Sequence, residues 1–351
     1  MATMSGVPDS DVSAAVSPAL AAQIAARHYA VAATAERLPS EFDDTFRLTG
    51  ADGTRWLLKI AAGSEPALRS GVGFQTALLL HLAAVAPELP VQRVVPAVDG
   101  RPEVVAGGRL VRLTSWLDGR LLGPGASSPG LRRSIGGTLA RLNLSLRGFE
   151  HPGAARTHRW DLQRFGALRP LLAELPAASR GALADCLDRF EAVVAPSLAG
   201  VRTQVIHSDF HGENVLTDGA RVTGILDFGD ALTGPVPMDV GVAACYQLGV
   251  GGPDAAVPPP ALLGPAADLV AGYHAVDPLS AADVALAAEF LVARVAARII
   301  LSQAHAARDP GNAGYLLRRT PAAIAHFGAL SGIGTGEIGR RLAAACRLEV
   351  T

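Results

Sequence analysis

Three oxygen-bearing side chains in the C-terminal half are of types that could hold a metal–nucleotide complex. Asp209 and Asn214 belong to one polar stretch, and Asp227 directly follows an apolar run that begins at Val222. Carboxylate and amide oxygens are the ligands that Mg²⁺ prefers, and substrate phosphates and water usually fill its remaining positions. With Asn214 and Asp227 assigned to the metal, Asp209 remains free to accept a proton from a substrate hydroxyl. The alternative is an ordinary network of turn-capping side chains.

Short apolar runs are expected to position these groups. Val205-Ile206 and Val215-Leu216 bracket the polar residues 207–214. The sequence therefore predicts a polar loop pinned between two short strands. A loop held at both ends can aim its side chains.

Lys59 is the single lysine of this chain, which otherwise uses arginine wherever a cation stands. It lies in the apolar strand Trp56 to Ile60, where a solvated surface charge would be out of place. A compact ammonium acts as a point charge on phosphate oxygens, which a guanidinium fork does not reproduce. We expect Lys59 to bind phosphate; the alternative is a lysine that extends to solvent from a strand end.

The motif H-x-D-x-x-x-x-N, formed by His207, Asp209 and Asn214, is followed by the Asp-Phe-Gly of residues 227–229. This pattern resembles the aminoglycoside phosphotransferase and choline kinase-like superfamily, which shares the protein-kinase fold. The segments SEFDDTFRL, RLVRLTSWLDGRLL and ILDFGDA are similar to those of its hydroxylysine kinase branch. The resemblance extends over roughly residues 35 to 330.

The resemblance implies an α+β, bilobed protein-kinase-like fold with a small β-rich N-lobe and a larger helical C-lobe. It divides the chain into a flexible leader (1–16), an N-lobe with the nucleotide lid and lysine (17–116), and a C-lobe with the catalytic loop, metal site and acceptor-binding helices (117–351). Periodicity and turn signals predict the individual elements. They are helices at 18–29, 70–85, 131–146, 183–194 and 284–305, hairpins formed by 40–48 with 54–60 and by 91–98 with 109–116, and a boundary loop at 123–130.

The same resemblance assigns nucleotide binding to the N-lobe. A glycine-rich G-x-G-x-x-G is absent, and SEFDDTF takes its place. Ser40 and Thr45 are among the small or polar residues that would cover the phosphates there. Leu113, Thr114 and Trp116 would belong to the hinge where an adenine or guanine meets backbone groups.

Two further positions concern the support of these groups. The family pairs its lysine with a glutamate, whose place here falls at Gln75. Either Gln75 suffices, or Glu65 or another acid replaces it, or the nucleotide itself orients Lys59. His207, grouped with the catalytic residues, is interpreted as a brace of the polar loop. Asp239 is either the N-cap of the next helix or a second brace, the place that the family's aspartate takes.

Four polar residues, Arg294, Arg298, Ser302 and His305, follow one another at steps of four, four and three in the helix predicted at 284–305. Helical geometry puts them on one face. This face is either the solvated side of an amphipathic helix or a side that offers cations to an acceptor carboxylate or to phosphate. Pairing with Glu289 or Asp283 would also satisfy it.

The implied activity is that of a small-molecule kinase, which transfers the γ-phosphoryl group of ATP or GTP, with Mg²⁺, to a hydroxyl of an amino acid or amino alcohol. The acceptor's ammonium would meet Asp230, Glu213 or Glu289, and its carboxylate Arg294 or Arg298. One alternative is an aminoglycoside O-phosphotransferase, but residues 284–319 carry five arginines against two acids, which does not suit a polycationic acceptor. The other is a catalytically silent, kinase-like binding protein, favoured by Gln75 and the missing glycine loop.

Composition limits the partners and the compartment. The formal net charge is -1, which gives no electrostatic reason to expect nucleic acid or a membrane surface. No stretch of 18 uncharged apolar residues occurs, and the N-terminus lacks the basic residues of a signal peptide. Three scattered cysteines indicate a reducing cytoplasm. The expected partners are those that the resemblance implies, a nucleotide and a small acceptor, and the oligomeric state stays open.

Overall fold

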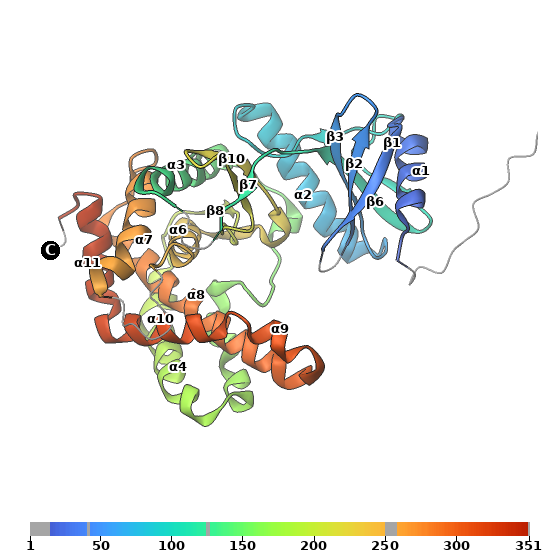
Figure 1. Ribbon diagram of the computed structural model, residues 1–351. Coiled ribbons are helices and arrows are strands. Elements are labelled where there is room, and N and C mark those ends of the chain that lie inside the picture. Colours follow the sequence, from blue (N-terminus) through green and yellow to red (C-terminus); the bar gives the residue numbers. More distant parts are fainter. Residues whose placement is uncertain (1–14, 41–42, 124–126, 250–257, 350–351) are drawn as a thin grey trace, which may run out of the picture. The chain divides into compact units, whose positions relative to one another are not determined.

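The computed structural model describes residues 15–40, 43–123, 127–249 and 258–349. The chain divides into two units (Figure 1). The N-terminal unit runs to Asp118 and includes His151–Gly153, and the C-terminal unit contains the remainder from Gly119. The first unit is built on a β-sheet and the second is mainly helical, which confirms the α+β fold expected from the sequence.

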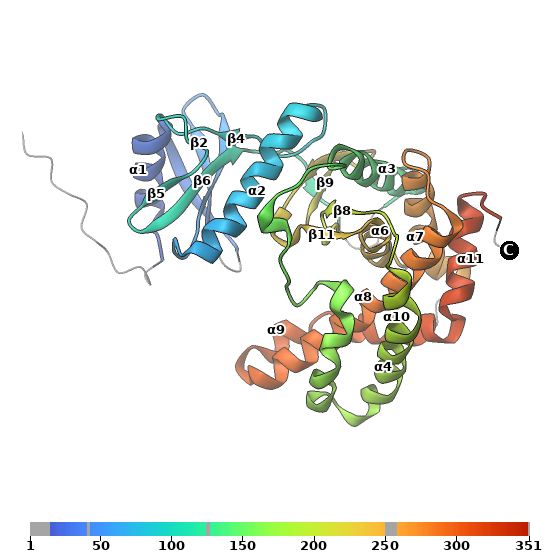
Figure 2. The ribbon, with the colours of Figure 1, turned by 180° about the vertical axis from the view of Figure 1, so that it is seen from behind.

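The N-terminal unit is a sheet with a helix on either side (Figures 1 and 2). The sheet order is β1-β2-β3-β6-β4, with β5 also paired to β6, and every pairing is antiparallel. Ser17 caps the first helix by accepting a hydrogen bond from the Leu20 amide. The elements are α1 (Pro18–Tyr29), β1 (Ala33–Leu38), β2 (Asp44–Gly50), β3 (Arg55–Ile60), α2 (Pro66–Val85), β4 (Val94–Val95), β5 (Val104–Ala106) and β6 (Arg109–Ser115).

The first predicted hairpin is confirmed as β2 and β3, with Gly53 at a φ of 82° in the turn. The second predicted pairing is also found, since β4 pairs antiparallel with β6, but the prediction missed the short strand β5 that lies between them in sequence. The structure pairs β6 with β5 through Gly107 and Gly108, whose φ values of 54° and 73° suit a tight hairpin turn. The segment at 91–98 supplies only the two-residue strand β4.

Residues 1–14 of the predicted leader lie outside the described residues. Val16, which the prediction also assigned to the leader, is only 6% exposed and belongs to the core of the first unit. Its amide donates to Asp44 at 3.0 Å, and its carbonyl accepts a hydrogen bond from Arg37. The core of the first unit therefore includes a residue that the prediction assigned to the leader.

Among the described residues, one helix is long and apolar enough to cross a membrane by length and composition alone, namely α2. Phe74, Leu78 and Leu82 on this helix are fully buried in the protein. The helix also carries the charged Arg69. A core helix passes the same length and composition test, so α2 is weak evidence for a membrane span.

The C-terminal unit combines two small sheets with a set of helices. The predicted helices at 131–146 and 284–305 are confirmed, and the one at 183–194 is α4 together with a π-helical turn. The sheets are β7 (Arg120–Leu121), β9 (Val215–Thr217) and β10 (Val222–Ile225), and β8 (Thr203–Ile206) with β11 (Leu232–Pro235). The helices are α3 (Pro129–Ser145), α4 (Ala177–Arg189), α5 (Ala195–Ser197), α6 (Val236–Cys245), α7 (Pro259–His274), α8 (Ala281–Arg308), α9 (Ala313–Leu317), α10 (Thr320–Ile333) and α11 (Thr335–Ala345).

Two glycines allow helices of this unit to approach closely. A Cβ at Gly241 on α6 would lie 2.4 Å from the carbonyl oxygen of Ala287 on α8. A Cβ at Gly136 on α3 would lie 1.9 Å from the carbonyl oxygen of Leu269 on α7. The α6–α8 contact matters for the site, because α6 and α8 each carry a residue that contacts the polar loop.

Candidate active site

The polar loop (residues 207–214) connects β8 to β9, as predicted, and His207 ties it to the end of β10. The His207 side chain is fully buried; its Nδ1 accepts from the Asp209 amide at 3.3 Å, and its Nε2 lies 3.0 Å from the Leu226 carbonyl oxygen. A carbonyl can only accept, so Nε2 carries the proton. The ring also packs against Phe210 and Phe228. This geometry is that of a brace between the loop and Asp227.

Asp239 braces the same loop from the first turn of α6. Its carboxylate accepts from the amides of His207 at 3.3 Å and Ser208 at 2.8 Å. These bonds stabilise the positive φ of 66° at Ser208, which is costly for a residue with a side chain. Burial is the largest effect on the Asp239 carboxyl and raises its pKa. The N-cap of α6 is Pro235, so the alternative of Asp239 as a cap is wrong.

Asp209 is held on both carboxylate oxygens. Oδ1 accepts from Arg294 Nη2 at 2.5 Å, and Oδ2 lies 3.0 Å from both His211 Nε2 and Asn214 Nδ2. Burial would raise the pKa of Asp209, but the hydrogen bond from His211 and the charge of Arg294 outweigh it and hold the pKa well below its usual range. The carboxylate is therefore ionised at neutral pH and presents acceptor oxygens.

Arg294 is 2% exposed, so the interpretation of its helix face as solvated is wrong for this residue. Its guanidinium lies 4.5 Å from the ring centroid of Trp160, and its Nε and Nη2 donate to the Tyr246 hydroxyl at 3.3 and 3.1 Å. Arg298, one turn further, is half-buried and lies over the Tyr246 ring at 5.0 Å. The face thus turns toward the polar loop at Arg294.

The other two residues of this face have partners of their own. The Ser302 hydroxyl donates to the Ile299 carbonyl and lies 2.9 Å from the Thr320 hydroxyl. The His305 ring contacts the Arg159 guanidinium. Neither residue therefore offers a free group to a substrate.

Asn214 and Asp227 have the donor atoms that a magnesium site needs. The Asn214 amide nitrogen is used by the Asp209 carboxylate and carbonyl, which leaves its oxygen as the atom for a metal. Asp227 has a left-handed φ of 55°, and one of its carboxylate oxygens accepts from the Gly229 amide at 2.9 Å. No group of three or more His, Cys, Asp or Glu side chains within the described part of the chain could hold a metal alone. One amide and one carboxylate fit Mg²⁺ that completes its shell with phosphate and water.

The three acids predicted to meet an acceptor's ammonium lie in different surroundings. Glu213 pairs with Arg319, and Glu289 pairs with Arg189. Asp230 has weaker partners: its Oδ1 lies 3.9 Å from His158 Nδ1 and 4.0 Å from Arg156 Nη2. Burial raises the pKa of Asp230, and its charge interacts with those of His158, Asp209 and Arg294. Of these three acids, Asp230 is therefore the one whose charge interacts with that of Asp209.

The predicted phosphate-binding residues lie on neighbouring strands of the N-terminal unit. Lys59 is half-buried on β3, directly opposite Thr45 on β2. The Thr45 hydroxyl is buried and has no hydrogen-bond partner among the described residues. Gln75 accepts from Arg112 at 3.1 Å, and no ion pair to Lys59 is found in the part of the chain that the structure describes. Gln75 therefore has another partner, and the structure identifies no acid that replaces it.

The other residues predicted to bind the nucleotide differ in whether their backbone groups already take part in the sheet. Leu113 and Thr114 lie inside the sheet, where β6 pairs with β3 on one side and β4 on the other. Their backbone groups form the hydrogen bonds between these strands, which argues against hydrogen bonds from them to the nucleotide base. Trp116 follows the strand and is flanked by Arg47 and Arg55. Ser40 is exposed.

Several residues of the site were missed from the sequence. His211 lies two residues after Asp209, so the loop itself contained the signal for a third polar group. Trp160 and His158 come from a segment about fifty residues upstream, with no motif to connect them to the loop. Tyr246 directly follows α6, and its contact with Arg294 requires the tertiary packing of α6 against α8.

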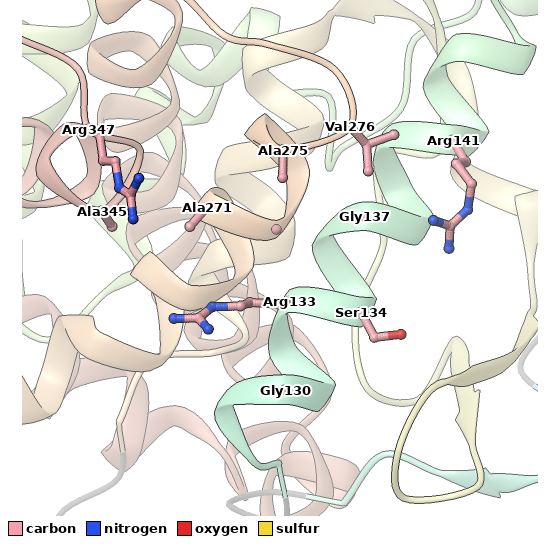
Figure 3. Close-up of a pocket in the computed structure, with 11 residues that line it drawn as sticks. Gly130, Arg133, Ser134, Gly137, Arg141, Ala271, Ala275, Val276, Ala345 and Arg347 are labelled. Atoms are coloured by element: carbon pink, nitrogen blue, oxygen red, sulfur yellow. The ribbon is translucent and has the colours of Figure 1, made fainter.

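A separate pocket of about 620 Å³ lies between α3, α7 and the end of α11 (Figure 3). Arginines and small residues line this pocket, and none of the predicted site residues is among them. The lining residues include Arg133, Arg141, Arg347, Ser134, Gly137 and Gly272. The pocket is therefore distinct from the polar loop and its partners.

Comparison with known proteins agrees with this geometry. Residues 34–282 match the Phosphotransferase enzyme family. Hydroxylysine kinase of Danio rerio is 26% identical over 340 residues, which cover 90% of this chain and 91% of the relative. Homoserine kinase of Methylobacillus glycogenes is 30% identical over 167 residues, which cover 47% of this chain and 49% of that one. The structure of a microcompartment-associated aminopropanol kinase matches with a TM-score of 0.60 at 21% identity, covering 92% of this chain and 98% of the other.

These matches confirm the resemblance inferred from the sequence motifs, including the hydroxylysine kinase branch. The nucleotide co-substrate follows from the family, since its kinases transfer phosphoryl groups from nucleotides. The chain belongs to the Phosphotransferase enzyme family and is a small-molecule kinase that acts on hydroxyl acceptors.

Proposed function

We propose that this kinase phosphorylates the hydroxyl group of an amino acid or amino alcohol, with Asp209 as the residue that receives the hydroxyl proton. The observation that carries the proposal is the fixed position of the Asp209 carboxylate. It is ionised, only 17% exposed and held by side chains on both oxygens. A carboxylate held in this way can orient an incoming hydroxyl without rearrangement of the loop.

The reaction is a direct transfer between two oxygens. The acceptor oxygen forms a bond to the γ-phosphorus of ATP or GTP, and the bond from that phosphorus to the bridging oxygen of the nucleoside diphosphate breaks. The hydroxyl proton passes to Asp209 and from there to solvent. The brace formed by His207 and Asp239 keeps the carboxylate in place while the charges move.

Charge neutralisation is assigned to three other residues. Asn214 and Asp227 hold Mg²⁺, which when bound neutralises phosphate charge and orients the transferred group. Lys59 binds phosphate oxygens from the N-terminal unit, with the unpartnered Thr45 hydroxyl beside it on the next strand. Trp116 is the candidate for contact with the nucleotide base.

The three cysteines are free thiols, in keeping with our proposal of a cytoplasmic location.

The acceptor class is inferred from the charges near Asp209. An ammonium suits Asp230, whose half-buried carboxyl has its cationic partners at 3.9 and 4.0 Å. Glu213 and Glu289 are weaker candidates because each already has an arginine partner. A carboxylate would suit Arg294 or Arg298. The names of the relatives agree with this class, since hydroxylysine, homoserine and aminopropanol each carry a hydroxyl and an amino group.

The test measures phosphate transfer from ATP and from GTP, with Mg²⁺, to 5-hydroxylysine, homoserine, ethanolamine, choline and several aminoglycosides. Transfer to an amino-acid-like or amino-alcohol acceptor, lost in Asp209→Asn, is the expected result. Transfer to aminoglycosides alone would overturn the proposed acceptor class, but it would be compatible with the proposed mechanism. Nucleotide binding without transfer to any acceptor would overturn the proposed activity.

A further inference from the structure

Arg294 occupies one oxygen of the residue that must receive the acceptor's proton. Its Nη2 lies 2.5 Å from Asp209 Oδ1, while His211 and Asn214 hold Oδ2. Both carboxylate oxygens are therefore engaged before an acceptor arrives. Each carboxylate oxygen can accept two hydrogen bonds, so an acceptor hydroxyl that approaches Oδ1 shares this oxygen with the guanidinium and competes with it for space and for the negative charge.

One nitrogen of the Arg294 guanidinium has no hydrogen-bond partner among the described residues. Nη1 of Arg294 is buried and finds no hydrogen-bond acceptor among the residues described. A buried unpaired donor is costly, and it is worst on a charged group. Two aromatic side chains, Trp160 and Tyr246, flank the guanidinium, with the Trp160 ring at 4.5 Å. The side chain is thus held beside the polar loop by rings, with one donor left for a ligand.

We propose that Arg294 is a specificity-determining positioning residue, which turns from Asp209 to the carboxylate of a hydroxy amino acid and thereby frees Asp209 for the acceptor hydroxyl. The inference rests on the proposed function and narrows its acceptor to one with a carboxylate. A guanidinium binds a carboxylate through two parallel N–H donors, so this ligand uses Nη1 together with Nη2. An amino alcohol supplies no such anion, and Arg294 then remains on Asp209.

Other charges near the site are consistent with a zwitterionic acceptor. Asp230 is close enough for its charge to interact with that of Arg294, and it offers a carboxylate to the acceptor's ammonium. Arg298 lies over the Tyr246 ring at 5.0 Å and is a second cation on the same helix face. An acid and a buried cation that both lie near Asp209 match an acceptor with an ammonium, a carboxylate and a hydroxyl.

The test compares acceptors that differ only by the carboxylate. The pairs are L-homoserine with 3-aminopropan-1-ol, L-serine with ethanolamine, and 5-hydroxylysine with 1,5-diaminopentan-2-ol. We measure kcat and KM for each member with the wild type, Arg294→Met, Arg294→Lys and Arg308→Met. Arg308 is the matched control, because it is another arginine of α8 that pairs with an exposed acid, Glu174, away from the polar loop.

In the wild type, kcat/KM for the preferred amino acid should exceed that for its decarboxylated partner by about 10- to 100-fold, the range for hydrogen bonds to a charged group. Arg294→Met should bring this ratio close to one. It should do so by lowering kcat/KM for the amino acid while kcat for the amino alcohol stays level or rises, because Asp209 is no longer covered. Arg294→Lys should restore part of the preference, and Arg308→Met should behave as the wild type.

A structural role for Arg294 predicts a different pattern, in which both acceptors lose turnover equally. That result, or a wild type without preference for the carboxylate, would overturn the inference while transfer itself still supported the proposed function. Absence of transfer to every acceptor would overturn the proposed function and the inference with it. Tryptophan fluorescence gives a readout without turnover, since Trp160 stacks on Arg294. The amino acid should change it in the wild type, and the amino alcohol should not; a response retained in Arg294→Met counts against the inference.

Discussion

The Nε2 of His207 lies 3.0 Å from the carbonyl oxygen of Leu226 and so joins the polar loop to the strand that leads into Asp227. The two segments that carry the proposed base and the proposed metal ligands are thereby fixed to one another. His207 adds a second bond at 3.3 Å to the amide of Asp209 itself. One buried imidazole thus sets the position of groups that the motif places eighteen residues apart.

Removal of this imidazole should lower activity without removal of any reacting group. His207→Phe keeps a ring between Phe210 and Phe228 but loses both hydrogen bonds. We expect kcat to fall by about 10- to 100-fold, the usual cost of losing a residue that orients a ligand. His274→Phe is the control, because it loses a similar bond from the Leu279 amide elsewhere in the same unit. Equal losses of kcat in the two variants, measured at the same folded fraction, would contradict the brace.

Asp209→Asn should separate nucleotide binding from chemistry. We expect nucleotide affinity, measured by calorimetry, to stay near the wild-type value, because the nucleotide contacts are assigned to other residues. Turnover should fall by about 10² to 10⁴, the range for loss of a general base. Asp227→Asn is the comparison and should weaken Mg²⁺ binding instead. A mutant at position 209 with wild-type turnover would remove this carboxylate from the mechanism.

Thr45→Val tests the nucleotide side of the proposal. The hydroxyl is buried without a partner among the described residues, so its replacement by an isosteric methyl should leave stability unchanged or raise it by up to about 1 kcal/mol. If the hydroxyl binds phosphate beside Lys59, KM for the nucleotide should rise by about 10-fold. The two measurements are thermal unfolding and nucleotide titration of the rate. A variant that is less stable and has an unchanged KM would show that Thr45 has a structural role.

The pH dependence of stability can be tested at Asp277, whose side chain is 4% exposed. Burial would raise the pKa of this carboxyl, but hydrogen bonds from Arg202 and Tyr273 lower it overall. A pKa that is lower in the folded state than in the unfolded chain stabilises the protein above the unfolded value of about 3.9 and loses that contribution as the pH falls. Asp277→Asn should therefore lower the free energy of unfolding by about 2 kcal/mol at pH 7.

The difference between wild type and Asp277→Asn should shrink as the pH is lowered through the folded-state pKa. Chemical denaturation at a series of pH values measures it. A difference that stays constant down to acidic pH would show that the variant acts through packing rather than through the charge.

Adjacent glycines on α3 offer a test of the helix packing. A Cβ at Gly136 would lie 1.9 Å from the Leu269 carbonyl, whereas at Gly137 the nearest atom would lie at 3.4 Å, an ordinary contact. Gly136→Ala should cost about 1 to 3 kcal/mol or more through overpacking. Gly137→Ala should be neutral or stabilising by up to about 1 kcal/mol from helix propensity. Equal stabilities would mean that α3 and α7 can separate at little cost.

Local signals in the amino-acid sequence were sufficient for most elements and for the polar loop. The helix at 18–29 was predicted from its start signal and periodicity, and the hairpin around Gly53 from its turn residues, because these features depend on neighbouring residues alone. The residues of the polar loop and Asp227 were found for the same reason. Their spacing along the chain is short, and two apolar strands bracket them.

Strand β5 and the environment of Arg294 were not predicted in this way. β6 pairs with both β4 and β5, and the three-residue strand β5 is defined by that pairing rather than by a local pattern of its own. Helical spacing placed Arg294 and Arg298 on one face but carried no information about whether that face is buried. Arg294 contacts Asp209 across 85 positions of the chain and Trp160 across 134. Such contacts arise from the packing of distant segments, which no local pattern encodes.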